Sequence, residues 1–264
     1  MDLQLKDKVA LITGSTAGIG LAIAKRLLQE GTNVIINGRS QERLDEVVRE
    51  LKKDFKDAKI RAIATDFNSK REIQELFNVL DEVDILVNNV GVYKAGCFFE
   101  MGDGEWYRHF EINVMSGVRL SRYFLPRMLE RNWGRIVFVS SECAELVPPD
   151  MLAYSMTKTA MVSISKGLAQ LTKSTGVTVN AILPGSTMSE GAERFLEEEA
   201  QKSGKQKGEV EANFFKEIRT SSLLQRFANV DEVASTITYY CSPLASATNG
   251  AAIKVEGGST GGLI

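Results

Sequence analysis

A tyrosine and a lysine stand four residues apart in the segment LAYSMTK, residues 152–158. On a helix, residues with this spacing lie on one face, so the phenol of Tyr154 and the ammonium of Lys158 can meet. A free phenol has a pKa of about 10 and exchanges protons poorly near neutral pH. A nearby cation stabilises the phenolate and lowers that pKa, which makes Tyr154 a candidate general acid or base. An exposed pair on a solvated helix is the alternative.

A glycine-rich loop forms a second candidate site. The segment TGSTAGIG, residues 13–20, places Gly14, Gly18 and Gly20 between an apolar run and an amphipathic run. Glycines at a strand-to-helix turn allow a tight turn and let a pyrophosphate approach the N–H groups that open the helix. The spacing GxxxGxG differs from the general GxGxxG fingerprint, and glycines alone are weak evidence. Their position after the first strand supports a nucleotide site.

The end of the second apolar run indicates how a nucleotide ribose would be bound. An acidic residue at this position would favour a ribose with an unphosphorylated 2′-hydroxyl. Residues 37–40 read NGRS and contain no acidic residue. The planar guanidinium of Arg39 suits a 2′-phosphate instead, so the sequence favours NADP over NAD. Ala17 leaves the glycine loop without a second basic group. A solvated surface arginine is the alternative interpretation.

Taken together and in this order, the motifs resemble those of the classical short-chain dehydrogenases/reductases. They are TGxxxGIG at 13–20, NNVG at 88–91, Asn113, Ser141, Tyr-xxx-Lys at 154–158 and Pro-Gly at 184–185. The resemblance runs from about residue 6 to residue 258, nearly the whole chain. It implies an oxidoreductase that acts on CH–OH or C=O groups, in which a nicotinamide carries the hydride and the protein supplies orientation and a proton.

The resemblance also implies four catalytic roles. Tyr154 would protonate the carbonyl oxygen during reduction or act as the base in the reverse direction. Lys158 would lower the tyrosine pKa and bind the nicotinamide ribose. Ser141 is similar to the serine that hydrogen-bonds the substrate oxygen, and Asn113 to the asparagine that holds a water linking the lysine to solvent.

The implied cofactor is NADP(H), with NAD(H) possible. Asp66 resembles the acid that contacts the adenine, residues 184 and 185 would approach the nicotinamide, and Val90 replaces the alanine usual in the family. Ser189 stands where the family often has a threonine that reaches the carboxamide. The residues expected to contact the nucleotide are Gly14, Ser15, Gly18, Ile19, Gly20, Arg39, Asp66, Phe67, Asn88, Gly91, Tyr154, Lys158, Pro184, Gly185, Thr187 and Ser189.

Short apolar runs alternate with long amphipathic runs along the chain. Strands that are apolar on both faces, alternating with helices, imply a parallel sheet covered on both sides. We therefore expect residues 1–264 to form a single doubly wound Rossmann-type domain with a seven-stranded parallel sheet, which binds ligands beyond the carboxyl ends of its strands. The expected strands are 9–13, 33–38, 59–66, 83–89, 135–141, 177–184 and 251–257, and the expected helices are 18–31, 41–55, 69–80, 103–131, 152–174 and 230–241.

The segment at about 186–226 interrupts this alternation. Two short amphipathic helices joined by the turn KSGKQKG are expected there. A long insertion at a ligand-facing edge is typical of a functional or mobile element, so we interpret it as a lid over bound substrate. An oligomer contact is the alternative. The side chains expected to pack are Phe195, Leu196, Phe214, Phe215 and Ile218.

The composition excludes several classes of protein. Hydrophobic residues make up 44% and charged residues 25% of the 264, which is ordinary for a globular protein. A net charge of −2 provides no global field for nucleic acid or acidic membranes. The start of the chain predicts no signal peptide, and no apolar run approaches the ~20 residues that span a bilayer. The three cysteines, Cys97, Cys143 and Cys241, predict neither disulfides nor a metal site, so a cytoplasmic location is expected.

Four further polar residues near these motifs are not assigned to catalysis. His109 has no partner motif and is expected to be structural. Cys143 follows Ser141 closely and lacks an activating base, so we interpret it as pocket lining. Glu142 and Glu145 either give the substrate loop a negative face or are solvated.

The substrate is the least determined feature. A small ketone, hydroxy compound or polyol is favoured, as for a carbonyl reductase or alcohol dehydrogenase. The alternative is a 3-oxoacyl-acyl-carrier-protein reductase, whose carrier-binding basic residues correspond to Asn132 and Thr175 here, next to Arg131 and Lys173. A nucleotide-binding sensor or scaffold without turnover is the alternative from another class. By resemblance, a homotetramer or homodimer is expected.

Overall fold

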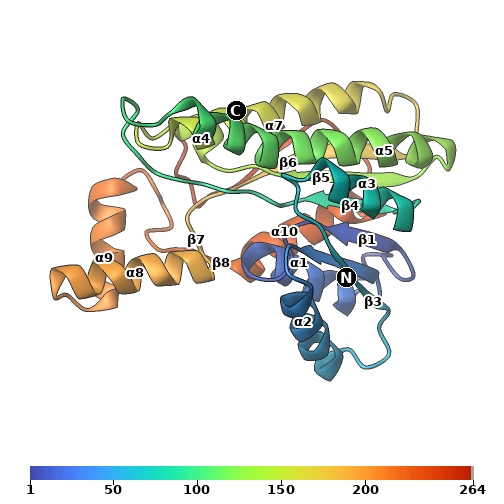
Figure 1. The fold of residues 1–264 in the computed structure, drawn as a ribbon, viewed down its shortest axis with the longest axis horizontal. Helices are drawn as coiled ribbons and strands as arrows, with labels where there is room; N and C mark the ends of the chain where they lie inside the picture. Colours follow the sequence, from blue (N-terminus) through green and yellow to red (C-terminus); the bar gives the residue numbers. More distant parts are fainter. Residues whose placement is uncertain (263–264) are drawn as a thin grey trace.

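Seven parallel strands form the centre of the protein in our computed structural model, which describes residues 1–262 (Figure 1). The strand order reverses between β1 and β4, as in a doubly wound sheet. This confirms the predicted fold class. In spatial order the strands are β3 (Ile60–Ala64), β2 (Asn33–Gly38), β1 (Val9–Ile12), β4 (Ile85–Asn88), β5 (Gly134–Val139), β6 (Val177–Pro184) and β9 (Ala252–Val255).

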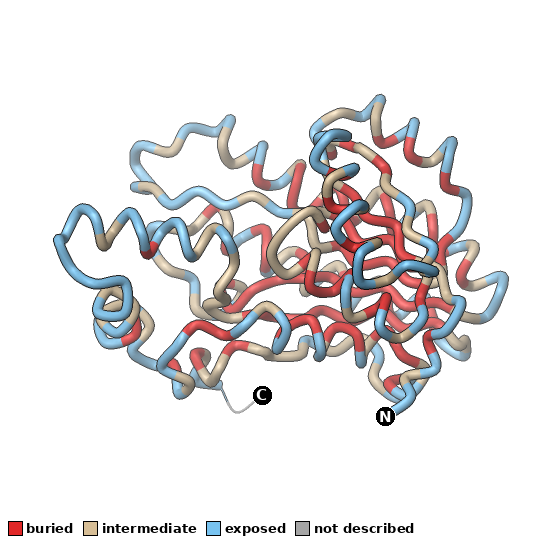
Figure 2. Tube along the Cα trace, turned by 90° about the horizontal axis from the view of Figure 1, so that it is seen from below, coloured by how far each residue is buried: buried red, intermediate tan, exposed pale blue. Residues whose placement is uncertain are grey.

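Helices cover both faces of the sheet (Figure 1). One face carries α1 (Gly18–Gln29), α2 (Gln41–Asp54) and α10 (Val230–Cys241). The other carries α3 (Lys70–Val79), α5 (Ser116–Glu130) and α7 (Leu152–Gln170). Figure 2 shows the buried residues concentrated in this central region, while the outer helical turns are exposed. Every residue of β5 and β6 is buried, as expected for strands covered on both faces.

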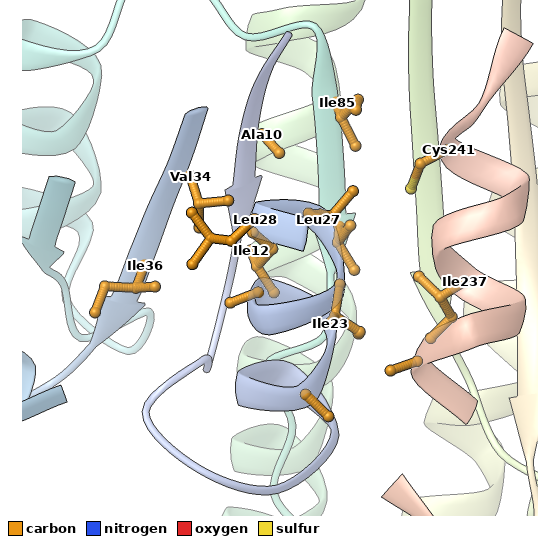
Figure 3. Close-up of a cluster of buried hydrophobic side chains, with 14 of the residues drawn as sticks. Ala10, Ile12, Ile23, Leu27, Leu28, Val34, Ile36, Ile85, Ile237 and Cys241 are labelled. Atoms are coloured by element: carbon orange, nitrogen blue, oxygen red, sulfur yellow. The ribbon is translucent and has the colours of Figure 1, made fainter. Parts of the chain in front are cut away.

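The core under α1 shows how one amphipathic helix is fixed to the sheet (Figure 3). Ile23 and Leu27 are four residues apart on one face and are fully buried. They pack with Ile12 of β1 and with Ile237 of α10 in the same cluster. Burying a side chain of this size contributes about 1.5–3 kcal/mol, so this contact holds the start of α1 at the carboxyl end of β1.

The predicted helix at 103–131 contains an irregular turn. It consists of α4 (Asp103–His109), a π-helix η1 (Phe110–Met115) and α5 without a break. The sequence does not indicate this widening, which is often found at functional sites. The side chain of Asn113, inside η1, donates to the carbonyl of Val92 at 2.9 Å and accepts from its N–H at 2.7 Å.

The predicted insertion forms a separate helical layer at the edge of the molecule (Figure 1). It comprises β7 (Thr187–Met188), α8 (Glu190–Ser203), α9 (Lys207–Asn213) and a π-helix η2 (Phe214–Ile218), and it is followed by β8 (Ala228–Asn229). Leu196, Phe215 and Phe227 form its buried cluster, and the ring of Phe214 stacks on that of Phe227 at 5.1 Å. The expected packing of Ile218 is wrong, since this side chain is exposed.

Four short elements were not predicted. β7 and β8 pair in parallel as a two-stranded sheet of their own. The short helix α6 (Cys143–Leu146) follows β5, and a 3₁₀ turn η3 (Pro243–Ala245) follows α10. Elements of two to four residues carry no periodic pattern, so only the pairing or loop closure around them makes them recognisable.

Candidate active site

The Tyr154–Lys158 pair lies on the inner face of α7, against the carboxyl end of β5. The Lys158 Nζ donates to the carbonyl of Val139 at 2.9 Å and lies 5.3 Å from the centre of the Tyr154 ring. Lys158 is only 4% exposed, so the alternative of a solvated surface pair is wrong. The hydroxyl of Ser140 donates to the backbone carbonyl of Lys158 at 2.8 Å and holds α7 in this register.

Ser141 and Tyr93 complete the surroundings of the phenol. Ser141 follows β5 directly, and its hydroxyl accepts the N–H of Cys143 at 3.1 Å. The ring of Tyr93 meets the Tyr154 ring edge to face, with centroids 6.1 Å apart. A substrate oxygen between Ser141 and Tyr154 could therefore accept two hydrogen bonds, beside an aromatic wall.

The pKa values of this pair differ from those expected from the sequence. Burial raises the pKa of the Tyr154 phenol above its usual value, the Glu142 carboxylate adds to this, and a hydrogen bond with Ser141 opposes it. Burial also lowers the pKa of Lys158 to about 8. The expected lowering of the Tyr154 pKa by Lys158 is not present in this structure, where desolvation of the phenol is the largest effect. A raised pKa keeps the phenol protonated at neutral pH but makes it a weaker proton donor.

Asn113 reaches the same region through Gly91. A side chain at Gly91 would lie 3.5 Å from both Asn113 Oδ1 and Lys158 Nζ, so the three residues are adjacent. The side-chain amide of Asn113 also donates to the Thr157 hydroxyl on α7 at 3.0 Å. Asn113 therefore ties the widened helix, the loop after β4 and α7 together behind the lysine.

The glycine loop is built to admit a ligand at the start of α1. Gly14 and Gly18 have positive φ angles of 62° and 54°. Ala17 is the N-cap of α1 and offers no side chain to the first N–H groups, which leaves them available to an anion. A Cβ on Gly20 would lie 2.3 Å from the Gly14 carbonyl oxygen, so only glycine permits this tight loop. A nucleotide pyrophosphate fits these features.

The loop after β2 holds the residues expected at the ribose. Arg39 is exposed and forms no ion pair within residues 1–262. Asn37 is buried instead, where its side chain accepts from the Gly14 N–H at 3.2 Å and donates to the Ile63 carbonyl at 2.9 Å. Ser15 also fixes the loop, since its hydroxyl donates to the Ile12 carbonyl at 2.7 Å. Arg39 thus remains free to meet a ligand beside the glycine loop.

Three residues expected at the adenosine differ in accessibility. Asp66 is partly exposed, and its carboxylate accepts from the Asn68 N–H at 2.9 Å. The side chain of Phe67 lies in the core, so a nucleotide could reach only its backbone. The side chain of Asn88 is also buried, and it faces Ser121 at 3.5 Å. Asn89 borders the cavity instead, and its side chain donates to the Gly14 carbonyl at 3.0 Å.

The loop after β6 brings the expected nicotinamide residues to the cavity. Pro184 accepts the N–H of Glu142 at 2.8 Å, and the N–H of Gly185 donates to Val255 at 3.0 Å. The Thr187 hydroxyl donates to the Gly185 carbonyl at 2.9 Å. Ser189 is the N-cap of α8 and lies against Gly18 of the glycine loop.

One cavity of about 600 Å³ joins these segments at the carboxyl edge of the sheet. Ser141, Tyr154 and Lys158 line it together with Ile19 and Gly20 of the glycine loop. Arg39 and Asp66 lie outside it, which is consistent with an adenosine half bound on the adjoining surface. Other polar residues of the lining, including Asn89, Asp150, Ser186 and Arg219, lie in segments expected near the site but were given no individual role from the sequence.

The sequence predicted neither a metal site nor a membrane-spanning segment. Residues 1–262 contain no cluster of three or more side chains suited to a metal ion. None of the helices described in that range is long and apolar enough to cross a membrane.

His109 is buried on α4, contacts the Glu105 carbonyl at 2.9 Å and lies outside the cavity. Glu145 is not merely solvated, because it pairs with Lys254 at 2.7 Å.

Comparison with known proteins identifies the family. The family described as short chain dehydrogenase matches residues 8–200. An uncharacterised oxidoreductase of Bacillus subtilis is 45% identical over 258 residues, which cover 98% of each chain. A 3-oxoacyl-[acyl-carrier-protein] reductase of Aquifex aeolicus is 33% identical over 98% of this chain and 99% of its own. The chain is therefore an oxidoreductase that belongs to the short-chain dehydrogenase family, which confirms the resemblance seen in the sequence.

Solved structures agree with this assignment. The structure of L-sorbose reductase from Gluconobacter frateurii, complexed with NADPH and L-sorbose, superposes with a TM-score of 0.91. Its sequence is 31% identical to this chain, and the match covers all of both chains. An actinorhodin polyketide ketoreductase with NADPH is also similar, with a TM-score of 0.86 and 31% identity.

Proposed function

We propose that this protein reduces a small ketone to an alcohol with NADPH, or catalyses the reverse reaction. The observation that carries the proposal is the convergence of Tyr154, Lys158 and Ser141 in the one cavity that also opens onto the glycine loop. The similar L-sorbose reductase and ketoreductase, both with NADPH, support the direction and the cofactor.

The residues divide the reaction between them. The nucleotide, when bound, supplies hydride to the carbonyl carbon. Ser141 holds the carbonyl oxygen by a hydrogen bond, and Tyr154 gives its phenolic proton to that oxygen as negative charge develops on it. Lys158 binds the nicotinamide ribose through its ammonium, and the first N–H groups of α1 receive the pyrophosphate. Asn113 keeps the loop carrying Gly91 against Lys158.

The same proposal includes a lid over the substrate. Phe195, Phe214 and Ile218 of the 186–226 segment line the cavity on the side away from the sheet. Exclusion of water by these apolar side chains would strengthen the hydrogen bonds to the reacting oxygen. The cytoplasmic location and the homotetramer or homodimer remain predictions.

A carrier-tethered substrate is supported less well. The similarity to the Aquifex aeolicus reductase favours it, but the side chain of Asn132 accepts the N–H of Gly176 at 2.8 Å and closes a turn. Arg131 is engaged by the Glu82 carboxylate and lies 3.9 Å from Asp84. Of the two cations beside these positions, Arg131 is therefore neutralised, and only the exposed Lys173 is left without an ion pair among the described residues to hold an acidic carrier.

The reductase proposal is tested by NADPH oxidation against short diketones, cyclic ketones, keto-sugars and a 3-oxoacyl thioester. Turnover of a free ketone supports it, and turnover of the thioester alone supports the carrier-tethered alternative. Tight NADPH binding without turnover of any compound would favour the sensor or scaffold alternative.

The cofactor preference is tested at Arg39. The substitution Arg39→Gln is expected to raise the KM for NADPH by at least about tenfold and to leave the KM for NADH nearly unchanged, since a charge-assisted phosphate contact is worth roughly 1.5–3 kcal/mol. Arg49→Gln, on an exposed position of α2, removes the same charge and is the control. Equal effects on both nucleotides, or a parent enzyme that prefers NADH, would contradict the assignment of Arg39.

The pH dependence of nucleotide binding is tested through Lys158. Because its pKa is lowered to about 8, the ammonium is present below that pH and is lost above it. Affinity for NADPH, measured by titration of nucleotide fluorescence, is therefore expected to be constant from pH 6 to 7 and to fall above about pH 8. Lys158→Met is expected to bind weakly at all pH values without the inflection. An unchanged inflection in this variant would show that another group is responsible.

A further inference from the structure

A buried ion pair lies in the cavity, beyond the proposed catalytic residues. Glu142 directly follows Ser141, and Arg219 ends the π-helix η2 of the lid segment. The Arg219 Nε donates to Glu142 Oε1 at 3.0 Å, and the two side chains are 11% and 4% exposed. The hydroxyl of Ser186, next to Gly185, donates to the same oxygen at 3.3 Å. The pair thus joins the loops after β5 and β6 to the lid.

The pair leaves hydrogen-bonding groups unused. Glu142 Oε2 is buried and has no partner among the described residues. Buried ionised oxygens are rarely left unpaired, so this atom calls for a donor that the chain itself does not provide. On the other side, only Nε of the Arg219 guanidinium hydrogen-bonds within residues 1–262, and its two Nη groups remain as donors. Both residues line the cavity that holds Tyr154.

The charges of the cavity restrict what the ligand can be. The charge of Arg219 is already balanced by Glu142 at 3.0 Å. Asp150 also lines the cavity, and its carboxylate forms no ion pair within the described residues. A substrate carboxylate would therefore meet two acidic side chains and no uncompensated arginine, because the remaining cation of the cavity, Lys158, is assigned to the nicotinamide ribose. An uncharged molecule with hydroxyl groups could donate to Glu142 and accept from Arg219.

We propose that Glu142 and Arg219 are the residues that select the substrate, and that they select an uncharged ketone carrying hydroxyl groups. An oxygen of that molecule accepts from an Arg219 Nη group, and one of its hydroxyls donates to Glu142 Oε2 once a shift of the side chains exposes that oxygen, which is closed to solvent in this structure. Because Glu142 is adjacent to Ser141, this contact holds the carbonyl at a fixed distance from Tyr154. The inference rests on the proposed ketone reduction and adds the substrate class to it.

The test compares three ketones of similar length: fructose as a neutral ketohexose, 2-hexanone without hydroxyls, and 5-ketogluconate with a carboxylate. The parent protein with NADPH is expected to show a kcat/KM for fructose at least about tenfold above those for the other two, since sites built around hydroxyl contacts reject analogues that lack them. In Glu142→Gln the uncompensated Arg219 is expected to raise the ratio of kcat/KM for 5-ketogluconate over fructose by about tenfold or more. Misfolding would lower the activity on both ketones and cannot produce such a change in their ratio.

Glu145→Gln is the matched control, because Glu145 stands one turn further on in α6 and pairs with Lys254 outside the cavity. It is expected to keep the parent ratios. A parent protein that reduces 2-hexanone or 5-ketogluconate as well as fructose would overturn this inference and leave the reductase function intact. Unchanged ratios in Glu142→Gln would also overturn it. Failure to reduce any ketone, including the wider panel above, would instead overturn the proposed function.

Discussion

Replacing Tyr154 with phenylalanine is expected to lower kcat for ketone reduction by roughly 10²- to 10⁴-fold, the usual contribution of a positioned general acid. The substitution removes only the hydroxyl, so the ring keeps its edge-to-face contact with Tyr93 and the helix keeps its register. Burial holds the phenol protonated in the parent protein, and its hydroxyl hydrogen-bonds with Ser141. The dissociation constant for NADPH is expected to change by less than about threefold, because the hydroxyl acts on the substrate oxygen.

The experiment measures initial rates and nucleotide titrations side by side. Tyr107→Phe is the control, because Tyr107 is an exposed tyrosine on α4 outside the cavity and should keep parent activity. If Tyr154→Phe retained more than about a tenth of the parent kcat, a different proton donor would have to be sought. Cys143 is the nearest other acid, and burial raises the pKa of its thiol.

The second large effect is expected at Gly20. A methyl group there would lie 2.3 Å from the Gly14 carbonyl oxygen and 2.9 Å from the Ser15 Cα, and both of these contacts are with backbone. Because backbone cannot rotate away as a side chain can, Gly20→Ala must open the loop that would receive the pyrophosphate. Nucleotide affinity is expected to fall by at least about 100-fold, and overpacking is expected to cost about 1–3 kcal/mol of unfolding free energy.

Gly167→Ala is the control, and it is expected to change the stability in the opposite direction. Gly167 lies inside α7 with no atom within 4 Å of an added Cβ. The alanine is expected to leave nucleotide binding unchanged and to stabilise the protein by roughly 0.5–1 kcal/mol, because it restricts the unfolded chain and favours the helix. Isothermal titration with NADPH and urea unfolding measure the two quantities. Parent-like binding by Gly20→Ala would show that the glycine loop does not form the pyrophosphate site.

Much of the fold was predictable from the sequence because its signals are local. β2 and β6 begin and end at the predicted residues, since runs that are buried on both faces are bounded by turns. The spacing of Tyr154 and Lys158 fixed their common face on α7 before any packing was known. The ordered motifs also predicted the family, which the comparisons confirm.

The tertiary structure decided the features that depend on segments meeting across the chain. Glu142 and Arg219 are 77 residues apart, and neither stretch contains a sign of the other. Asn89 borders the cavity and Asn88 does not, because the Asn89 side chain contacts the glycine loop while the Asn88 side chain contacts Ser121. The pKa of Tyr154 rises because the surrounding elements remove water from the phenol, an effect that the spacing of Tyr154 and Lys158 does not reveal. Desolvation and long-range pairing arise only when the chain is folded, whereas periodicity is written in consecutive residues.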